Sequence, residues 1–477
     1  MADHSRPDLC IVGAGALGIA LALHARRLGA SVTLVDRGPP EPGDGPQQAA
    51  RVAALQASAA RAEQMRGAAA LGLAAADPSP SLKAVQERAR QVAAARAPLD
   101  GHERLTALGI AVVSGAARFI DPRTLAVGDT RIRAGGFILA VGARPLVPAL
   151  PGLEEAGYFT PDTILDNTRK LTHLLVIGGD AAGFALAQAF ARLGSEVTLV
   201  PQGRALAGHD AETAGILLDL LAGEGVRVED GGVVRAIQPR SQGIGALVEL
   251  PGRGEVALDL SHILLAAGAA PDIETLAPEA ARLHGRRGDG SRLAPGPLGR
   301  TANRRVRVVG AAAGIDQWHH ALSHGRAVVE TIVLGLPRRR PGAQPLLVMT
   351  DPALAQIGRL AGPVDRLHPG HGLHRGNFAE NDQARALGRE AGLIKVLTGP
   401  QGRIMGASLV GPGATELAGM LAMAMDRGIG LDALAGIAAP HPSLAASLVA
   451  LGEDCLGDQK PPAWAKRLGA LRRLVPF

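Results

Sequence analysis

The chain has 477 residues, 47% of them hydrophobic and 20% charged, which is the composition of a globular protein with several cores and excludes extensive disorder. The net charge of +6 comes from scattered arginines, and aromatic residues make up only 2%, so platforms for stacking bases are scarce and we expect no nucleic-acid partner. Two cysteines, Cys10 and Cys455, are too few for a disulfide framework or a structural zinc cluster, and we expect no metal site.

The N-terminal sequence shows no basic-then-apolar signal segment. No uninterrupted run of roughly 18 apolar residues, the length needed to span a bilayer, occurs anywhere in the chain. We therefore expect a cytoplasmic protein.

Residues 8–38 predict a βαβ unit with a nucleotide-binding turn. The segment "GAGALG" places Gly13, Gly15 and Gly18 at the spacing that turns a strand sharply into a helix and brings backbone next to a pyrophosphate. Asp36 ends the second strand 21 residues after Gly15, where a carboxylate accepts hydrogen bonds from an adenosine ribose. A purely structural glycine turn is the alternative.

Residues 173–203 repeat this pattern with one change. In "VIGGDAAG", Gly178 and Gly183 keep the outer glycine positions, but Asp180 stands at the middle one. A carboxylate there adds bulk and like-charge repulsion at an anion site, so we expect no tight dinucleotide binding unless Asp180 turns outward and the ligand shifts. Each unit is followed by a buried strand and a glycine turn, at 136–145 and 262–272, which favours two tandem domains.

The rest of the chain divides by composition. An Ala/Gln/Arg-rich stretch between 37 and 110 has helical spacing, and its Arg51 is expected to face solvent or, alternatively, the first nucleotide site. The segment 336–342, "LPRRRPG", is typical of a linker, and alternating strands and a helix after it predict an α+β domain. The C-terminal segment 457–477 predicts a basic amphipathic tail. Docking of this tail on its own domain is the commoner outcome, and binding to a membrane surface is the alternative.

The two turns, "ILAVGARP", "ILLAAGAAPD", "TDPALAQIG", "RIMGASLVG" and "HPSL" together resemble the pyridine nucleotide-disulphide oxidoreductase family, which includes dihydrolipoamide dehydrogenases and mercuric reductases. The resemblance implies an α/β protein with two Rossmann-like domains, of FAD and NAD(P) type, and a C-terminal dimerisation domain that forms a homodimer. The implied boundaries are 1–150 with 273–337, then 151–272, then 345–456. Gly13, Gly15, Gly18 and Asp36 match the FAD fingerprint, and Gly142 matches a later turn beside the cofactor.

Several positions depart from the family pattern. The redox cysteine pair is expected near residues 44 and 49, and neither is cysteine. The family's His-Pro-Thr-x-x-Glu reads His441-Pro442-Ser443 with Ala446 in place of the glutamate, so His441, the one candidate acid/base, lacks its orienting carboxylate and is better interpreted as a structural residue at a dimer contact.

Two further departures concern the cofactors. Gly310 keeps the first position of the family's Gly-Asp pair, but Ala311 replaces the aspartate that holds the ribitol chain, which is expected to weaken FAD binding by roughly 1.5–3 kcal/mol. In the second unit Ala185 replaces the glutamate that faces the nicotinamide, and Pro201 replaces the ribose acid, with Arg204 nearby as a possible phosphate partner.

The sequence therefore favours an FAD-dependent oxidoreductase without a redox dithiol, in which the flavin passes electrons, taken from NAD(P)H or another donor, directly to a small-molecule or protein acceptor. The alternative is a catalytically degenerate dimeric scaffold that binds flavin or a partner protein. Dithiol-dependent lipoamide or mercuric ion reduction is excluded, because no two cysteines can form the pair.

Overall fold

The computed structural model describes residues 4–38, 46–95, 97–283, 295–336, 342–360 and 370–458. These residues form two compact units, Met1–Ala207 with Leu218–Pro341, and Gly208–Leu217 with Gly342–Phe477. The predicted linker at 336–342 and the predicted tail at 457–477 lie almost entirely outside the described residues.

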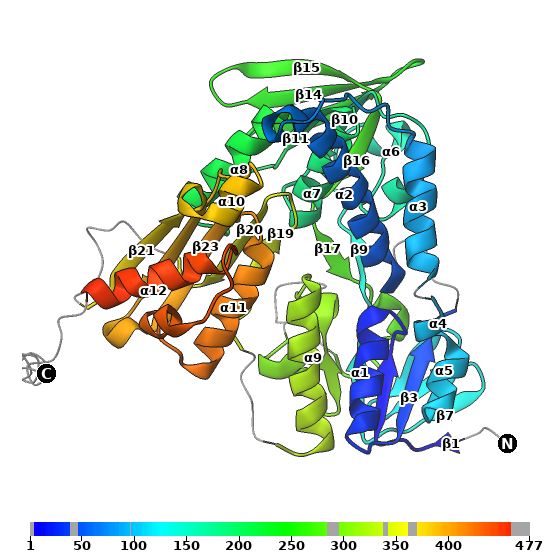
Figure 1. Cartoon of the computed structure of the whole chain (residues 1–477). Coiled ribbons are helices and arrows are strands. Elements are labelled where there is room, and N and C mark those ends of the chain that lie inside the picture. The colour runs from blue at the N-terminus through cyan, green and yellow to red at the C-terminus, as the bar shows by residue number, and fades with distance from the viewer. Residues whose placement is uncertain are drawn as a thin grey trace, which may run out of the picture. The chain divides into compact units, whose positions relative to one another are not determined.

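A five-stranded parallel sheet in the order β18-β8-β2-β3-β4 carries the first glycine turn. Its strands are β2 (Leu9–Val12), β3 (Val32–Asp36), β4 (Ile110–Ser114), β8 (Gly136–Leu139) and β18 (Val306–Val308). The strands β2, β3 and β8 are buried along almost their whole length, as expected for a sheet covered on both faces. Helices α1 (Ala16–Arg27) and α9 (Trp318–Val333) pack against each other beside this sheet (Figure 1).

The second glycine turn belongs to a four-stranded parallel sheet in the order β12-β11-β10-β16. Its elements are β10 (His173–Ile177), α7 (Ala181–Arg192), β11 (Glu196–Val200), β12 (Val226–Val228) and β16 (His262–Leu265). A meander of β13 (Val233–Pro239), β14 (Ile244–Leu250) and β15 (Gly254–Leu260) packs on it through a shared apolar core. The two predicted strand-and-turn segments continue into β9 (Ala143–Pro145) and β17 (Ala269–Pro271), which pair antiparallel.

Smaller elements complete the first unit. A second four-stranded sheet contains β1 (His4–Ser5), β5 (Ala117–Asp121), β6 (Thr124–Val127) and β7 (Thr130–Ile132). The Ala/Gln/Arg-rich stretch forms α2 (Pro46–Arg66) and α3 (Leu82–Ala94), which pack side by side, and α2 also packs against α7 (Figure 1). The short helices α4 (Ala97–Asp100) and α5 (His102–Ala107) precede β4, and α6 (Leu153–Ala156) precedes β10.

The second unit is an antiparallel sheet covered by helices. Its strand order is β19-β20-β23-β22-β21, from β19 (Leu346–Val348), β20 (Ala353–Gly358), β21 (Gly372–Asn377), β22 (Leu393–Thr398) and β23 (Ile404–Gly411). The helices α10 (Asp382–Ala386), α11 (Ala414–Arg427) and α12 (Ala446–Asp458) follow in chain order, and α11 and α12 share the sheet's apolar core. Residues of α8 (Ala211–Gly223) up to Leu217 belong to this unit.

A buried ion pair ties the start of α8 to β22. Lys395 Nζ donates to both carboxylate oxygens of Asp210, at 2.7 and 2.9 Å, and lies 3.1 Å from Glu212. The side chains of Lys395 and Asp210 are only 9% and 5% exposed. Asp210 also accepts the backbone N–H groups of Glu212 and Thr213, so its buried charge is well compensated.

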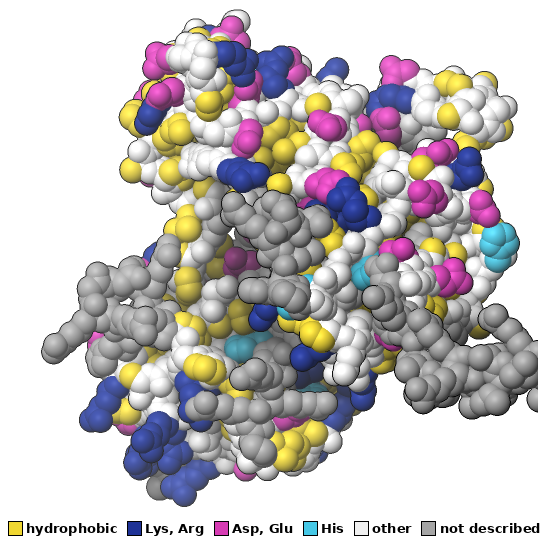
Figure 2. Space-filling view, turned by 90° about the vertical axis from the view of Figure 1, so that its left-hand side faces the viewer, with side chains coloured by type: hydrophobic (Ala, Val, Ile, Leu, Met, Phe, Trp, Pro, Cys, Tyr) yellow, Lys and Arg dark blue, Asp and Glu magenta, His cyan; other side chains and the backbone are white. Residues whose placement is uncertain are grey.

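The observed architecture confirms the predicted fold class of two Rossmann-like domains and an α+β C-terminal domain. Whether the first unit divides at residues 150 and 273, as expected, stays a prediction. Within the described ranges, no helix combines the length and the apolar character needed to cross a membrane. On the face drawn in Figure 2, acidic and basic side chains are interspersed over the upper half.

Candidate functional site

A cavity of about 910 Å³ opens where the order of strands in the first sheet reverses. The chain runs from β2 through α1 to β3 on one side, while β8 lies on the other side of β2. Val12 pairs with Leu139 in register, so the carboxyl ends of β2 and β8 lie next to each other. Such a switch point is the usual place for a dinucleotide in open α/β sheets, and the volume suits a large ligand.

Each glycine of the first turn has a different structural reason. Gly13 has φ +108°, and a Cβ there would lie 2.3 Å from the carbonyl oxygen of Ala140. A Cβ on Gly18 would lie 1.8 Å from the oxygen of Gly13, so only glycine lets helix and strand approach this closely. A Cβ on Gly15 would meet nothing within 4 Å, although Gly15 lines the cavity. Gly13 and Gly18 therefore build the turn, and Gly15 leaves space for a ligand.

The N-terminus of α1 is open toward this space. Gly15 occupies the N-cap position, no side chain of the described residues caps the helix, and no acidic residue lies in its first turn. Unpaired N–H groups and the helix dipole at such an end favour an anion. The residues present therefore fit a pyrophosphate, which is the group that the fingerprint predicts.

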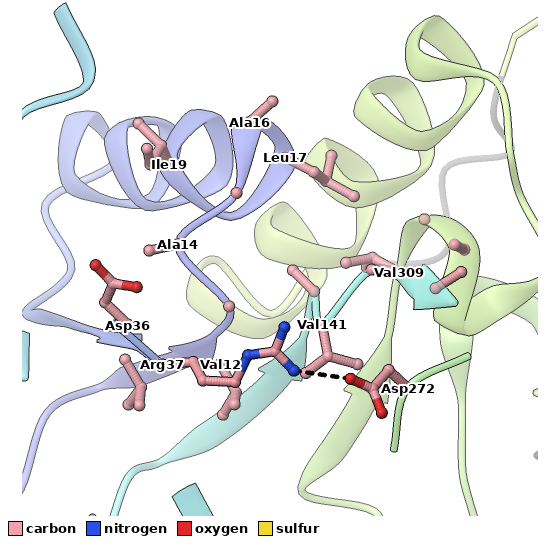
Figure 3. A pocket seen from close by; sticks show the side chains of 18 of the residues that line it. Val12, Ala14, Ala16, Leu17, Ile19, Asp36, Arg37, Val141, Asp272 and Val309 are labelled. Carbon is pink, nitrogen blue, oxygen red and sulfur yellow. Dashed lines mark hydrogen bonds and ion pairs between the residues drawn. The ribbon is translucent and has the colours of Figure 1, made fainter. Parts of the chain in front are cut away.

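Asp36 lies at one end of the cavity, at the carboxyl end of β3 (Figure 3). Its Oδ1 accepts the Gly38 N–H at 3.1 Å, and its Oδ2 lies 2.6 Å from Nε2 of His102. The next residue, Arg37, extends along the cavity and forms an ion pair with Asp272 at 2.9 Å (Figure 3). Asp36 thus lines the cavity at the end of β3, and its role in binding a ribose stays a prediction.

The remaining predicted positions of the first site also line the cavity. Gly142 follows β8 with φ +74°, and Gly310 has φ +60°. Ala311 lines the cavity as well, so an apolar methyl group stands at the position that the resemblance assigns to an aspartate for the ribitol chain. Asp316, just before α9, and Trp318, its first residue, line the cavity as well.

The second glycine turn is built like the first but carries its own anion. Gly178 has φ +112°, and a Cβ there would lie 2.0 Å from the oxygen of Ala266. A Cβ on Gly183 would lie 2.8 Å from the Ala266 Cβ, so both outer glycines keep their structural roles. Asp180 is the N-cap of α7, and its Oδ1 accepts the Gly183 N–H at 2.7 Å. A side-chain carboxylate thus occupies the helix end at which a phosphate would bind.

The surroundings of Asp180 are unfavourable to a further negative charge. Burial raises the pKa of the Asp180 carboxyl above its usual value, the hydrogen bond from Gly183 opposes this, and the Asp316 carboxylate raises it further. Pro201 packs closely against the turn, as the space at Gly179 shows: a Cβ there would be 2.9 Å from the Pro201 Cβ. Ala185 is buried in α7. Arg204 is exposed, and its role as a phosphate partner stays a prediction.

The expectation that Arg51 faces solvent is wrong. Its side chain is 13% exposed, and its Nη2 donates to the Leu165 carbonyl and to Asp166, both at 2.6 Å. The reason is that α2 lies against the segment 163–166, which offers a carbonyl and a carboxylate to the arginine. Arg51 does not line the cavity. Of the two expected cysteine positions, Ala49 is an exposed residue of α2, and position 44 lies outside the described residues.

His441 lies in the second unit and is not among the residues that line the cavity. Its side chain is 75% exposed, and Nε2 lies 3.7 Å from the Asp382 carboxylate, a contact that the sequence pattern did not predict. Cys455 is buried in α12, and Cys10 is buried in β2, where burial raises the pKa of its thiol. Neither cysteine is placed to act as a nucleophile.

Several cavity residues were not predicted. Arg37 directly follows Asp36, so its position was available from the sequence. His102, Asp162, Asp272 and Trp318 have no spacing relation to the fingerprint, and the fold brings them to the cavity. The β3–β4 pairing accounts for His102, and the β9–β17 pairing accounts for Asp272.

Comparison with known proteins gives consistent matches. The family model described as pyridine nucleotide-disulphide oxidoreductase matches residues 7–325, and its dimerisation-domain model matches residues 344–451. The chain is 28% identical to mercuric reductase of Streptomyces lividans over 93% of this chain and 95% of that protein. It is 26% identical to dihydrolipoyl dehydrogenase of Geobacillus stearothermophilus over 94% and 96%.

A solved structure, the HOCl-induced flavoprotein disulfide reductase RclA from Escherichia coli, has the same fold, with a TM-score of 0.80 at 22% identity over 94% of this chain and 99% of that one. Flavoproteins of this family bind FAD, and NAD(P) binding is typical of the family. Since the first model alone covers more than half of the sequence, the chain belongs to the pyridine nucleotide-disulphide oxidoreductase family, as a divergent member that lacks the redox-active cysteine pair.

Proposed function

We propose that this chain is an FAD-dependent oxidoreductase that works without a redox dithiol and delivers electrons directly to a small acceptor. The observation that carries the proposal is the contrast between the two glycine turns. At the first turn, no side chain of the described residues caps the N-terminus of α1, the space beside Gly15 is open, and both line a large cavity. At the second turn, the Asp180 carboxylate caps the N-terminus of α7.

The residues that would hold FAD are spread along the cavity. Asp36 would accept the ribose hydroxyls, the turn at Gly13 and Gly15 with the N-terminus of α1 would bind the pyrophosphate, and Gly142 and Gly310 would allow close backbone approach near the isoalloxazine. When bound, FAD supplies the redox chemistry. The chain itself binds the cofactor, orients it and limits which partner approaches it.

The electron donor is a second part of the proposal. Asp180 and the neighbouring Asp316 place negative charge where a dinucleotide phosphate would come near α7, so NADH and NADPH are poor donors. A neutral or cationic donor or acceptor that reaches the cavity beside Trp318 meets no such repulsion. Because the only cysteines are buried in separate elements, no thiol pair relays the electrons.

A homodimer through the C-terminal domain is proposed from the match to the dimerisation-domain model. His441 lacks a thiol to protonate, and its exposed side chain is proposed to belong to that dimer contact. The second candidate function, a scaffold without redox activity, is favoured by Ala311 and by the self-capped second turn.

The visible absorption spectrum of the purified full-length chain, before and after adding FAD, is the first test. The proposal requires flavin bands that bleach with a chemical reductant under anaerobic conditions and return when a quinone is added. A chain that takes up no FAD would rule out both the oxidoreductase and the flavin-binding scaffold. A bound flavin that does not reoxidise with any small acceptor would favour the scaffold.

A further inference from the structure

His102 contacts the carboxylate that the fingerprint assigns to the ribose. Its Nε2 lies 2.6 Å from Oδ2 of Asp36, and both residues line the cavity. Because a carboxylate only accepts, Nε2 carries the proton of this hydrogen bond. The Asp36 side chain is 19% exposed and that of His102 is 49% exposed, so the carboxylate is the more buried partner of the pair.

The fold brings these residues together across 66 positions of sequence. Strand β4 pairs in parallel with β3, with Asp36 opposite Ser114, and α5 leads into β4. Gly101 is the N-cap of α5 in an extended conformation, which places His102 at the first helical position beside the end of β3. The long-range pairing of β3 with β4 therefore fixes the distance between the imidazole and the carboxylate.

The Asp36 carboxylate can accept further hydrogen bonds beside those that it already has. Among the residues that the structure describes, His102 donates to Oδ2, and the Gly38 N–H donates to Oδ1 at 3.1 Å. Each carboxylate oxygen accepts about two hydrogen bonds, so each oxygen can accept about one more beside these. Two such acceptor positions on one carboxylate match the two vicinal hydroxyls of a ribose.

We propose that His102 is a cofactor-positioning residue, which holds the Asp36 carboxylate in the orientation that accepts both hydroxyls of the adenosine ribose. This inference rests on the proposed binding of FAD in the cavity. A merely structural contact would leave cofactor affinity unchanged when His102 is replaced, whereas a positioning residue changes that affinity through Asp36.

The test measures the dissociation constant of FAD for the full-length apoprotein, from the quenching of flavin fluorescence. The variants are His102→Ala, His102→Gln, Asp36→Asn and the double variant, with Glu103→Ala as a control, because Glu103 is the next exposed residue of α5 and does not line the cavity. We expect His102→Ala to weaken FAD binding about tenfold, which corresponds to one hydrogen bond to a charged group. His102→Gln keeps an N–H donor and should recover most of the affinity, and Glu103→Ala should bind like the unmodified chain.

The double variant separates positioning from an independent contact. If His102 acts through Asp36, then His102→Ala in the Asp36→Asn background causes no further loss, whereas independent contacts would multiply their effects. ADP, which contains the adenosine but no flavin, should lose affinity for His102→Ala by the same factor. Unchanged FAD and ADP affinity in His102→Ala, or multiplying effects, would overturn the inference while the proposed function stands. An unmodified chain that binds no FAD would overturn the proposed function itself.

Discussion

Replacing Asp180 tests directly whether a side-chain carboxylate closes the second nucleotide site. Asp180→Gly removes the carboxylate from the end of α7 and restores the glycine pattern, and glycine at an N-cap costs only a few tenths of a kcal/mol. Asp180→Asn is the matched control, because its side-chain oxygen still accepts the Gly183 N–H while the charge is lost.

The expected size of the effect follows from the distances involved. A phosphate oxygen that used the Gly183 N–H would have to occupy the place of Oδ1, now 2.7 Å from that nitrogen. Two unit charges about 4 Å apart repel by about 1 kcal/mol in water and about 4 kcal/mol near a protein surface. We therefore expect NADH to bind Asp180→Gly at least about fivefold more tightly than the unmodified chain, with Asp180→Asn between the two.

Isothermal titration with NADH and with ADP-ribose is the assay, and thermal unfolding is the fold control. Loss of the cap in Asp180→Ala should cost about 1 kcal/mol, or about 1–2 °C in Tm for a unit of this size. Micromolar binding of NADH by the unmodified chain would refute the reasoning. So would an Asp180→Gly variant that binds no better than Asp180→Asn, because the helix end would then not be the obstacle.

The pH dependence of stability gives an independent check on Asp180. The pKa of its carboxyl is raised in the folded chain, so folding favours the protonated form, and this contribution is fully present below the unfolded value of 3.8. It is lost as the pH rises from 3.8 through the raised folded value. Asp180→Asn should therefore gain Tm relative to the unmodified chain as the pH rises through this window, and the gain should disappear below it. A constant difference across the window would contradict the burial of this charge.

Three further predictions concern the first site and the C-terminal unit. Gly15→Val should lower the Tm of the apoprotein by no more than about 1–2 °C, the cost of a poor N-cap, but abolish FAD uptake. Gly13→Ala should lower the Tm more, because a Cβ would meet the Ala140 carbonyl oxygen at Gly13 but nothing within 4 Å at Gly15; equal Tm losses in both would contradict this. Ala311→Asp should strengthen FAD binding about tenfold or more, because it restores a charged acceptor beside the cavity. Flavin fluorescence measures this affinity, and no gain would mean that the ribitol chain lies elsewhere. Lys395→Met should destabilise the C-terminal unit by about 3–5 kcal/mol in urea unfolding, because Asp210 would stay buried without a counter-charge. A loss of stability under about 1 kcal/mol would show that the pair is not buried in solution.

The sequence by itself determined the elements that depend on local pattern. Gly13 and Gly18 could be assigned to a strand-to-helix turn because only glycine tolerates the positive φ and the close backbone contacts that such a turn requires. The same reasoning located Gly178 and Gly183, and the absence of a cysteine pair is enough to exclude dithiol chemistry. The place of Asp180 in the motif also predicted that its carboxylate stands at the start of the helix, where it caps α7.

Only the tertiary structure decided what surrounds those motifs. His102 reaches Asp36 because β4 pairs with β3, and Asp272 reaches Arg37 because β17 pairs with β9, which are long-range pairings that leave no periodic signal in the sequence. Arg51 is largely covered for the same reason, since its partners lie in a segment more than 100 positions away. Local periodicity reports which face of an element is buried, but the identity of the neighbour on that face depends on strand order and helix packing.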